Sequence, residues 1–293
     1  MERLAKLPLF IVVRNYCRLT KPGIILGNVI NAAVGIVLAS RGDFSASLFW
    51  GTLTGLSCVI ASACIYNNYI DRDCDKKMTR TRQRVLAQGL VPVSYALLLA
   101  SSIGLVGFLL LAAFANSLAV AVALAGFFIY VAIYSFVKYR SSYATLIGSF
   151  AGATPPVIGY CAVTERFDLT ALLLFALIVT WQMPHFFAIA IYRLEDYAAA
   201  KIPVLPLAKG IQATKLQMIA YIFAFVAVSS MFTLFGYVGY LHLIVTALLG
   251  IGWIWLGFCG IKCANDNQWA RKMFFFSLVV IMTLCMTIPF SAF

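Results

Sequence analysis

The sequence predicts an all-α, polytopic membrane protein with nine transmembrane helices. Of its 293 residues, 63% are hydrophobic and only 11% are charged, which is too little polar surface to cover a water-soluble globule. Nine apolar stretches, each about the 20 residues that a helix needs to cross the hydrocarbon core, are separated by short polar or turn-rich breaks. These long runs lack the alternating pattern of a membrane β-barrel, so helices are the expected elements.

The nine expected helices form one integral-membrane domain over residues 1–293, and residues 1–20 form a cytoplasmic segment before the first of them. The approximate centres of the helices are Asn31, Ser57, Gly104, Leu124, Ala153, Leu177, Phe225, Gly250 and Val280. In the fifth helix, Gly148, Gly152 and Gly159 with the pair Pro155–Pro156 predict close helix packing and a kink.

The charge pattern predicts how the chain is oriented. Residues 1–20 lack the short apolar core and small-residue cleavage site of a secretory signal, and they are unlike a mitochondrial leader, which favours a bacterial inner (plasma) membrane. In a soluble protein, a net charge of +12 would suggest binding to nucleic acid. In this membrane protein, the distribution of the charge instead indicates the topology. With a cytoplasmic N-terminus, all of the 22 lysines and arginines except Arg41 and Arg166 fall inside. The positive-inside rule therefore predicts a cytoplasmic N-terminus and a periplasmic C-terminus.

A polar cluster ends the second expected helix. Asn67, Asp71 and Asp75 are spaced four residues apart and therefore share one face of a continuing helix. Like charges at this spacing repel each other, more strongly in a half-dehydrated cavity, so the stripe needs a cation. Magnesium is typically held by one or two carboxylates and by substrate phosphates. We expect a Mg²⁺ site here, and we expect Asp73, on the opposite side, to pair with a neighbouring Lys or Arg.

A second acidic cluster ends the sixth expected helix. Glu195 and Asp196 precede the segment Ile202–Pro206, whose prolines prevent a regular helix. Both clusters end even-numbered helices, so they lie at the same membrane face, where they could converge on two magnesium ions that bridge one diphosphate. Arg80 and Arg84 follow the first cluster, and guanidinium groups suit diphosphate oxygens.

These motifs resemble those of a known superfamily. The first polar cluster, the second acidic cluster and the nine helices together are similar to the intramembrane prenyltransferases typified by 4-hydroxybenzoate polyprenyltransferase. Within that superfamily, several strings resemble the haem O synthase family over nearly the whole chain. They are Leu19–Pro22, Tyr66–Asp73, Pro184–Phe186, Tyr192–Arg193, Asp196–Tyr197 and Ile202–Pro206.

The resemblance implies an enzyme that transfers the farnesyl group of farnesyl diphosphate to a vinyl group of haem B, making haem O and releasing diphosphate. It implies Mg²⁺ as cofactor, the lipid bilayer as surroundings and an active site that faces the cytoplasm. A haem-copper terminal oxidase assembly or a haem A synthase would be the partner that takes the product, and nucleic acid is not expected. Ionisation leaves an allylic cation, so the site must neutralise the leaving group and exclude water until the new bond forms.

Carried over position by position, the resemblance assigns a role to each motif residue. The metal ligands would be Asn67, Asp71, Asp75, Glu195 and Asp196. The diphosphate would be bound by Lys21, Arg80, Arg84, Lys138, Arg140 and Arg193, and Lys201 is a further candidate of this chain's own. The catalytic residues would be Asp71, Asp75, Asp196 and His185. The chain departs from the family pattern at Gly23, Val85 and Lys201, where Arg, Pro and Gly are common.

Three further polar side chains are expected in the substrate cavity. His185 lies about ten residues before Glu195, hence roughly 15 Å into the membrane, and it would contact the haem or the reacting vinyl group. The alternative for this histidine is a hydrogen bond across the bundle beside a proline kink. Asn28 lies in the first helix, where an amide needs a partner, and it could assist the metal cluster. Tyr134 could shield the allylic cation with its ring. His242, near the outer end of a helix, is expected to be structural or interfacial.

Two alternative functions remain open from the sequence. The first is a quinone-pathway or other aromatic prenyltransferase of the same fold, from which Pro184–Phe187 and Ile202–Pro206 distinguish the haem family. The second is a membrane transporter, because polar residues near broken helices also mark substrate sites. Against transport, the acidic residues cluster at one membrane face, with no counterpart at the other face to support alternating access.

Overall fold

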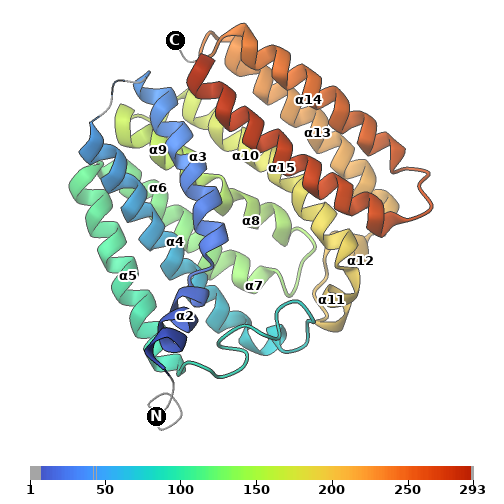
Figure 1. The fold of residues 1–293 in the computed structure, drawn as a ribbon. Helices are drawn as coiled ribbons and strands as arrows, with labels where there is room; N and C mark the ends of the chain where they lie inside the picture. The colour runs from blue at the N-terminus through green and yellow to red at the C-terminus, as the bar shows by residue number, and fades with distance from the viewer. Residues whose placement is uncertain (1–7, 42, 44, 292–293) are drawn as a thin grey trace.

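The described chain forms an α-helical bundle (Figure 1). The computed structural model describes residues 8–41, 43 and 45–291, and over these ranges it contains helices and turns but no strand. Nine helical segments of these ranges are long and apolar enough to cross a membrane. The predicted fold class and number of transmembrane helices are therefore confirmed. Residues 1–7 of the predicted cytoplasmic segment lie outside the described residues, and the sidedness of the two ends stays a prediction.

The spanning elements follow one another in chain order. They are α3 (Pro22–Ser40), α4 (Ala46–Asp75), α5 (Val93–Phe114), the run of α6 (Ser117–Phe128), η1 (Ile129–Tyr134) and α7 (Ser135–Val137), the pair α8 (Ala144–Gly152) and α9 (Thr154–Thr164), α10 (Leu169–Tyr192), α13 (Ile211–Leu234), α14 (Tyr240–Cys259) and α15 (Asp266–Ser291). The shorter helices are α2 (Leu9–Leu19), α11 (Leu194–Ala199) and α12 (Leu205–Ala208).

Local sequence explains where several helices begin. Ser45, Asn116 and Asp168 precede α4, α6 and α10, and a side-chain oxygen of each accepts a hydrogen bond from the backbone N–H three residues further on. Such caps satisfy donors that a helix leaves unpaired in its first turn. Pro22 suits the first position of α3 because that position needs no backbone donor.

The helices α3 and α9 cross in direct backbone contact. A Cβ atom added to Gly159 would lie 2.0 Å from the carbonyl oxygen of Ala32. One added to Gly35 would lie 2.0 Å from the carbonyl oxygen of Pro156. Only glycine allows two helix backbones to approach so closely. The fifth span is also divided into α8 and α9 just before Pro155, so the predicted close packing and kink are confirmed.

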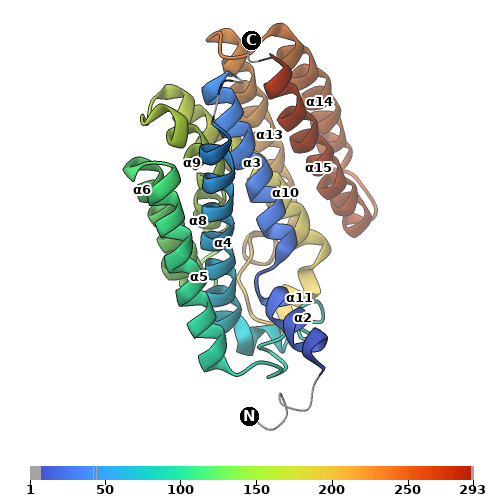
Figure 2. The same cartoon turned by 60° about the vertical axis from the view of Figure 1, so that its left-hand side comes forward.

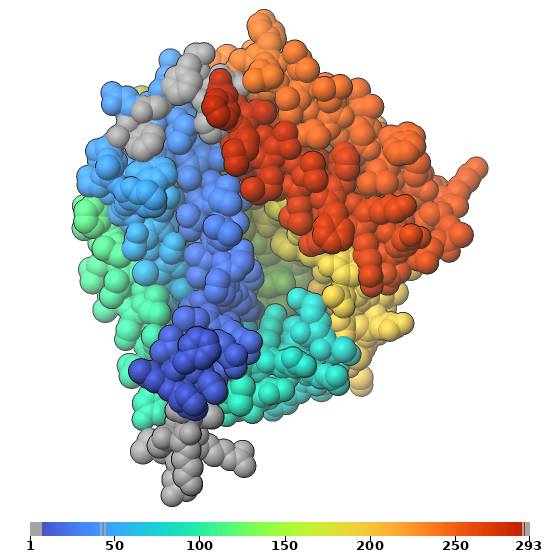
Figure 3. Space-filling view, viewed as in Figure 1, coloured from blue at the N-terminus to red at the C-terminus, as the bar shows by residue number. Residues whose placement is uncertain are grey.

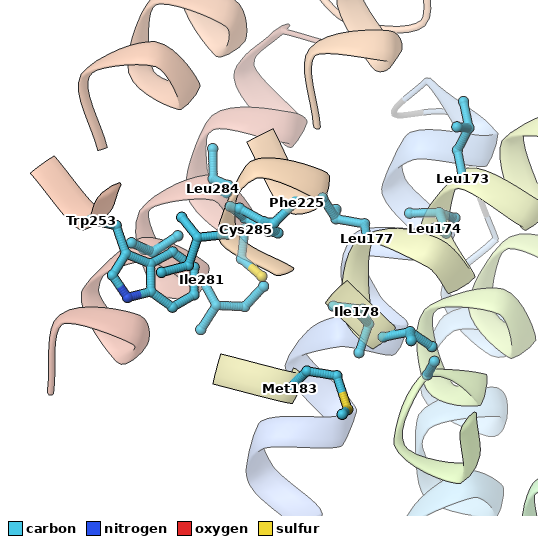
Figure 4. Packing of buried hydrophobic residues seen from close by; sticks show 14 of the residues in the cluster. Leu173, Leu174, Leu177, Ile178, Met183, Phe225, Trp253, Ile281, Leu284 and Cys285 are labelled. Carbon is cyan, nitrogen blue, oxygen red and sulfur yellow. The ribbon is translucent and has the colours of Figure 1, made fainter. Parts of the chain in front are cut away.

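Buried apolar side chains fall into two main groups on either side of α3. The larger lies between α10 and the C-terminal helices, where Leu177, Phe225, Trp253 and Leu284 meet (Figure 4). Each of these four is at most 3% exposed. The smaller group joins α3, α4, α5, α6 and α9. These two groups hold the helices that enclose the cavity described below.

The polar connecting segments gather at one end of the bundle. Figures 1 and 2 show α2, the loop that follows α4 and the short helix α11 at the end near the N-terminus, whereas α15 finishes at the opposite end. The last turns of α4 and α10 are therefore at the same end. This arrangement brings together the two acidic clusters, which come from distant parts of the chain.

The glycine contact between α3 and α9 makes a prediction about stability. Gly35→Ala should lower the unfolding temperature of the purified protein in detergent, because overpacking costs about 1–3 kcal/mol. This cost exceeds the gain of roughly 0.5–1 kcal/mol that alanine normally brings to a helix. Gly27→Ala on the same helix is the matched control, since a Cβ there meets no atom within 4 Å. Equal unfolding temperatures for the two variants, measured by circular dichroism, would contradict the contact.

Candidate active site

A cavity of about 540 Å³ lies within the bundle. Its walls come from α3, α4, the run from α6 to α7, α8, α9 and α10. Figure 3 shows the surface hollowed between α3 and α15, with atoms from the middle of the chain at the floor of the hollow. Charged side chains line the end of the cavity near the loop that follows α4. Apolar side chains such as Leu56, Ile158 and Ile178 line its interior.

The polar stripe on α4 faces this cavity. Asn67, Asp71 and Asp75 all line it, so the prediction that the four-residue spacing puts them on one helix face is confirmed. Asp71 is 8% exposed and Asp75 is 3% exposed. Asp73 points away from the stripe, and its carboxylate lies 2.9 Å from the ammonium group of Lys76. The predicted surface ion pair of Asp73 is therefore confirmed.

Each oxygen-bearing side chain of the stripe contacts a cation from another segment. Asn67 Oδ1 accepts a hydrogen bond from Lys21 Nζ at 2.8 Å. Asp71 forms an ion pair with Lys138. Both carboxylate oxygens of Asp75 accept from Arg84 Nη1 at 2.9 Å. Buried carboxylates are stable only with such partners, because removing a charge from water is costly.

The cations at this end are themselves held out of water. Burial, together with the nearby Arg84, lowers the pKa of Lys21 to about 8. Burial also lowers the pKa of Lys138, an effect that the neighbouring carboxylate of Asp71 opposes. Arg80 lines the same part of the cavity. Four basic groups thus face two carboxylates, and an additional anion would stabilise the charged form of both lysines.

One of the two residues of the second acidic cluster lies at this end of the bundle. Asp196 is buried, and its Oδ1 accepts a hydrogen bond from the backbone N–H of Thr79 at 2.8 Å. Two residues further on, Thr81 Oγ1 donates to the backbone oxygen of Asp75 at 3.2 Å. The loop that follows α4 is therefore fastened to both acidic clusters. Glu195, next to Asp196, is exposed.

The predicted site residues divide into two sets according to where the structure places them. Those that line the cavity are Lys21, Asn28, Asn67, Asp71, Asp75, Arg80, Arg84, Tyr134, Lys138 and His185. Those outside the described lining are Arg140, Arg193, Glu195, Asp196 and Lys201. The roles of both sets stay predictions, because position alone does not test them.

The interior of the cavity holds the uncharged polar residues. Asn28 Nδ2 donates to the backbone oxygen of Ile24 at 2.8 Å, so its amide is partly satisfied within α3. Tyr134 stacks on Tyr130 with ring centroids 5.6 Å apart. Both tyrosines belong to η1, a π-helical segment, and such segments often occur at functional sites.

The two histidines have different surroundings. His185 lines the cavity and is hydrogen bonded to Ser277 at 2.7 Å. His242 is 0% exposed, and its two ring nitrogens lie 3.1 Å from Ser229 Oγ and Thr287 Oγ1. The structural role predicted for His242 agrees with these contacts.

Sequence reasoning missed one side chain that acts directly on the stripe. Tyr139 OH donates to Asp71 Oδ1 at 2.7 Å, from the residue that follows Lys138. Burial and the adjacent carboxylate of Asp71 raise the pKa of this phenol far above its usual range, so it remains a donor. Its position beside a predicted diphosphate ligand is the signal that could have identified it.

Comparison with known proteins places the chain among prenyltransferases. A model of the UbiA prenyltransferase family matches residues 28–279. The chain is 50% identical over 280 residues to a protein of Protochlamydia amoebophila named protoheme IX farnesyltransferase, covering 96% of this chain and 99% of that one. It is 51% identical over 284 residues to a protein of the same name from Serratia proteamaculans, covering 96% of each.

Solved structures share the fold. A structure described as giving insights into the biosynthesis of digeranylgeranylglyceryl phosphate synthase in membranes has a TM-score of 0.81 at 16% identity, over 96% of this chain and 98% of that chain. A UbiA homolog from Archaeoglobus fulgidus bound to GPP and Mg²⁺ has a TM-score of 0.67 at 16% identity, over 94% of this chain and 99% of that one. At these identities the likeness concerns the fold alone.

The buried pair of Asp75 and Arg84 makes a prediction that does not depend on catalysis. Arg84→Ala leaves a buried carboxylate without its cation and should destabilise the protein by on the order of 3 kcal/mol. Added Mg²⁺ should recover part of this loss if the stripe binds a divalent cation. Thermal unfolding in detergent, with and without Mg²⁺, measures both effects.

The matched control breaks an exposed ion pair on the same stretch of chain. Lys76→Ala removes one of the two cationic partners of Asp73, the other being Arg72, and exposed pairs contribute only about 0–1 kcal/mol. The Lys76→Ala protein should therefore unfold close to the wild-type temperature. A loss as large as that of Arg84→Ala would mean that burial is not what makes the Asp75 pair important.

Proposed function

The chain belongs to the UbiA prenyltransferase family, and from this premise we propose that it transfers the farnesyl group of farnesyl diphosphate to a vinyl group of haem B, making haem O and releasing diphosphate. That it is a prenyltransferase follows from the family, and the name shared by its relatives supports haem B as the acceptor. The observation that carries the proposal is a single cavity with cations and carboxylates at one end and an apolar interior.

The two ends of the cavity suit the two ends of the donor substrate. Lys21, Arg84 and Lys138 face the space in which a diphosphate would be neutralised, and Arg80 adds a further guanidinium group. The apolar interior suits the isoprenoid chain. At about 0.8 kcal/mol per buried CH₂, a farnesyl group gains on the order of 10 kcal/mol gross from leaving water. The assignments of Arg140, Arg193 and Lys201 as further diphosphate contacts stay predictions.

The donor atoms at the cavity end fit magnesium. They are oxygens from one amide and two carboxylates, Asn67, Asp71 and Asp75, and each already contacts a cationic side chain. Within the described ranges, no three acidic, histidine or cysteine side chains group closely enough to hold a metal by themselves. This sparse set matches Mg²⁺, which takes its remaining ligands from water and substrate phosphates. Asp196 and Glu195 are the candidates for a second ion.

In the proposed reaction, the chain's own basic residues assist the first bond change. Magnesium, when bound, would lower the charge that develops on the diphosphate. Lys21, Arg84 and Lys138 stabilise that charge as the bond between C1 of the farnesyl group and oxygen breaks, and the electron pair leaves with the diphosphate. The vinyl π electrons then form the new bond to C1. Water adds to the resulting cation beside the porphyrin and releases a proton, which yields the hydroxyethylfarnesyl side chain.

Exclusion of water is the second task of the cavity. Tyr130 and Tyr134 offer aromatic faces on the cavity wall, where a π system attracts a developing cation. The apolar side chains around them keep the allylic cation from premature hydrolysis. Asn28, on α3, lines the same cavity.

We further propose where the reaction takes place. The basic end of the cavity lies on the side of the bundle that the positive-inside pattern assigns to the cytoplasm, so farnesyl diphosphate would enter from the cytoplasm. The membrane would be the bacterial inner membrane, and the whole chain would act as one domain. Haem O would pass to a haem A synthase or to a haem-copper oxidase assembly.

The two alternative functions, a transporter and a quinone-pathway prenyltransferase, are separated from the proposed function by different observations. Membership of a prenyltransferase family favours an enzyme over a transporter. A quinone-pathway enzyme would share the same carboxylates and cations, so only the acceptor separates it from the proposed function. Incubation of the purified protein with farnesyl diphosphate and either haem B or 4-hydroxybenzoate, followed by mass analysis, decides between them. Conversion of 4-hydroxybenzoate with haem B left unchanged would refute the haem assignment.

Two neighbouring aspartates test the role of the stripe. Asp71→Asn should reduce haem O formation and diphosphate release by about a hundredfold or more, because losing a proposed ligand of Mg²⁺ weakens the stabilisation of charge on the leaving diphosphate. Asp73→Asn, two residues away on the exposed side of α4, should retain wild-type rates. Equal rates for Asp71→Asn and the wild type would exclude the stripe from catalysis.

Metal removal gives an independent prediction. Chelation with EDTA should stop diphosphate release from farnesyl diphosphate, and an excess of Mg²⁺ should restore it, because the proposed Mg²⁺ takes its ligands from the stripe and from the substrate phosphates. Phosphate analysis after enzymatic cleavage of the released diphosphate measures the rate. Unchanged release in EDTA would show that the basic side chains suffice without a metal.

A further inference from the structure

His185 is held rigidly in the cavity wall by aromatic rings from two helices. Its ring stacks on Trp181, one turn earlier in α10, with centroids 4.9 Å apart and an interplanar angle of 26°. Phe274 of α15 lies at 4.8 Å, and Phe186 meets the ring edge-on at 5.4 Å. Trp181 is fixed in turn by a hydrogen bond from its Nε1 to the backbone oxygen of Ser277 at 2.8 Å. The imidazole plane therefore has little freedom to rotate.

The hydrogen bonds around Ser277 determine which ring nitrogen carries the proton. Ser277 Oγ donates its single proton to the backbone oxygen of Phe274 at 2.6 Å. Both contacts of this hydroxyl are hydrogen bonds only when His185 Nδ1 is protonated, because the hydroxyl then accepts from Nδ1 at 2.7 Å while it donates to Phe274. Nδ1 consequently carries the proton, and Nε2 has a free lone pair.

The free nitrogen has no partner within the protein. No residue of the described ranges hydrogen bonds to His185 Nε2, and the residue lines the cavity. His242, by contrast, uses both of its ring nitrogens in contacts between helices. An imidazole that is fixed by an outer hydrogen bond at Nδ1 and open at Nε2 has the arrangement of a metal ligand, in which the outer partner sets the tautomer.

We propose that His185 Nε2 is an axial ligand of the iron of haem B, and that Ser277 positions the ring for this contact. The proposal rests on the proposed function, which brings an iron porphyrin into the cavity. A proximal histidine is among the common haem ligands. His185 lies seven residues before the end of α10, about 10 Å along the helix axis. Coordination there anchors the porphyrin in the apolar interior, away from the charged end that receives diphosphate.

The test uses absorption and electron paramagnetic resonance spectra of the full chain in detergent, titrated with ferric haem B without farnesyl diphosphate. The wild type should show the spectrum of imidazole-ligated haem, with imidazole nitrogen couplings by pulsed resonance. His185→Ala should lose this spectrum and bind haem at least about tenfold more weakly, and free imidazole should restore the spectrum. Ser277→Ala should keep a histidine-type spectrum but weaken haem binding by about tenfold, as expected for loss of an outer partner.

Metal-free protoporphyrin IX separates coordination from packing. It has the ring and side chains of haem B but no iron, so His185→Ala should bind it as well as the wild type does. His242→Gln is the matched histidine control, and its haem spectrum should equal that of the wild type. If His185→Ala weakens both porphyrins equally, or leaves the haem spectrum unchanged, the iron contact is refuted and a packing or proton-transfer role takes its place.

The pulsed resonance measurement on the wild type needs no variant, so misfolding of a variant cannot leave the proposal undecided. Absence of imidazole nitrogen coupling in the wild-type haem complex would overturn it directly. Failure of the iron contact can also be distinguished from failure of the proposed function. A wild-type protein that makes haem O but shows no histidine-ligated haem refutes only the iron contact, whereas one that binds haem through His185 but forms no haem O refutes the transfer reaction.

Discussion

The neutralisation of two buried carboxylates at the end of α4 is the interaction on which the rest of the structure depends. Asp71 and Asp75 are nearly inaccessible, and unpaired charges in such positions would cost several kcal/mol each. Their cations come from elsewhere, Lys138 after α7 and Arg84 from the loop that follows α4. The same contacts therefore join separate segments and form the charged end of the cavity. At this end, the side chains that join separate segments are also those proposed to bind the substrate.

The opposite wall of the cavity is built by a different kind of contact. There, α10 and α15 are joined through Ser277, whose backbone oxygen and hydroxyl contact Trp181 and His185. The buried apolar group between α10 and the C-terminal helices supports this wall from behind. Asp196, which accepts a hydrogen bond from Thr79, joins the region after α10 to the loop after α4. The charged end and the aromatic wall are thus parts of one enclosure.

Much of the fold and part of the site could be predicted from residue spacing, because in a regular helix the spacing along the sequence determines which residues share a face. Asn67, Asp71 and Asp75 share a face since α4 continues without interruption for 30 residues, and the outward position of Asp73 follows from the same geometry. Apolar length alone was sufficient to predict nine spans.

Contacts that depend on packing between distant helices could not be predicted in this way. Ser277 meets His185 only because α15 packs on α10, and no local pattern marks that serine. Glu195 and Asp196 are adjacent in the sequence, yet one is exposed and the other buried. The chain changes direction at Arg193, between α10 and α11, and that break decides which carboxylate turns inward.

The π-helical segment η1 affects how the fourth span packs against two neighbouring helices, α9 and α4. A π turn contains one more residue than an α turn. The extra residue lies within Ile129–Tyr134, so the helical segments before and after η1 each direct their side chains independently of the other. Above it, Gly126 packs closely on Thr154 of α9. Below it, Lys138 reaches Asp71. A uniform α-helix would rotate one of these residues by about 100° relative to the other. The π-helical segment therefore allows one span to make both a close helix–helix contact at Gly126 and an ion pair at Lys138.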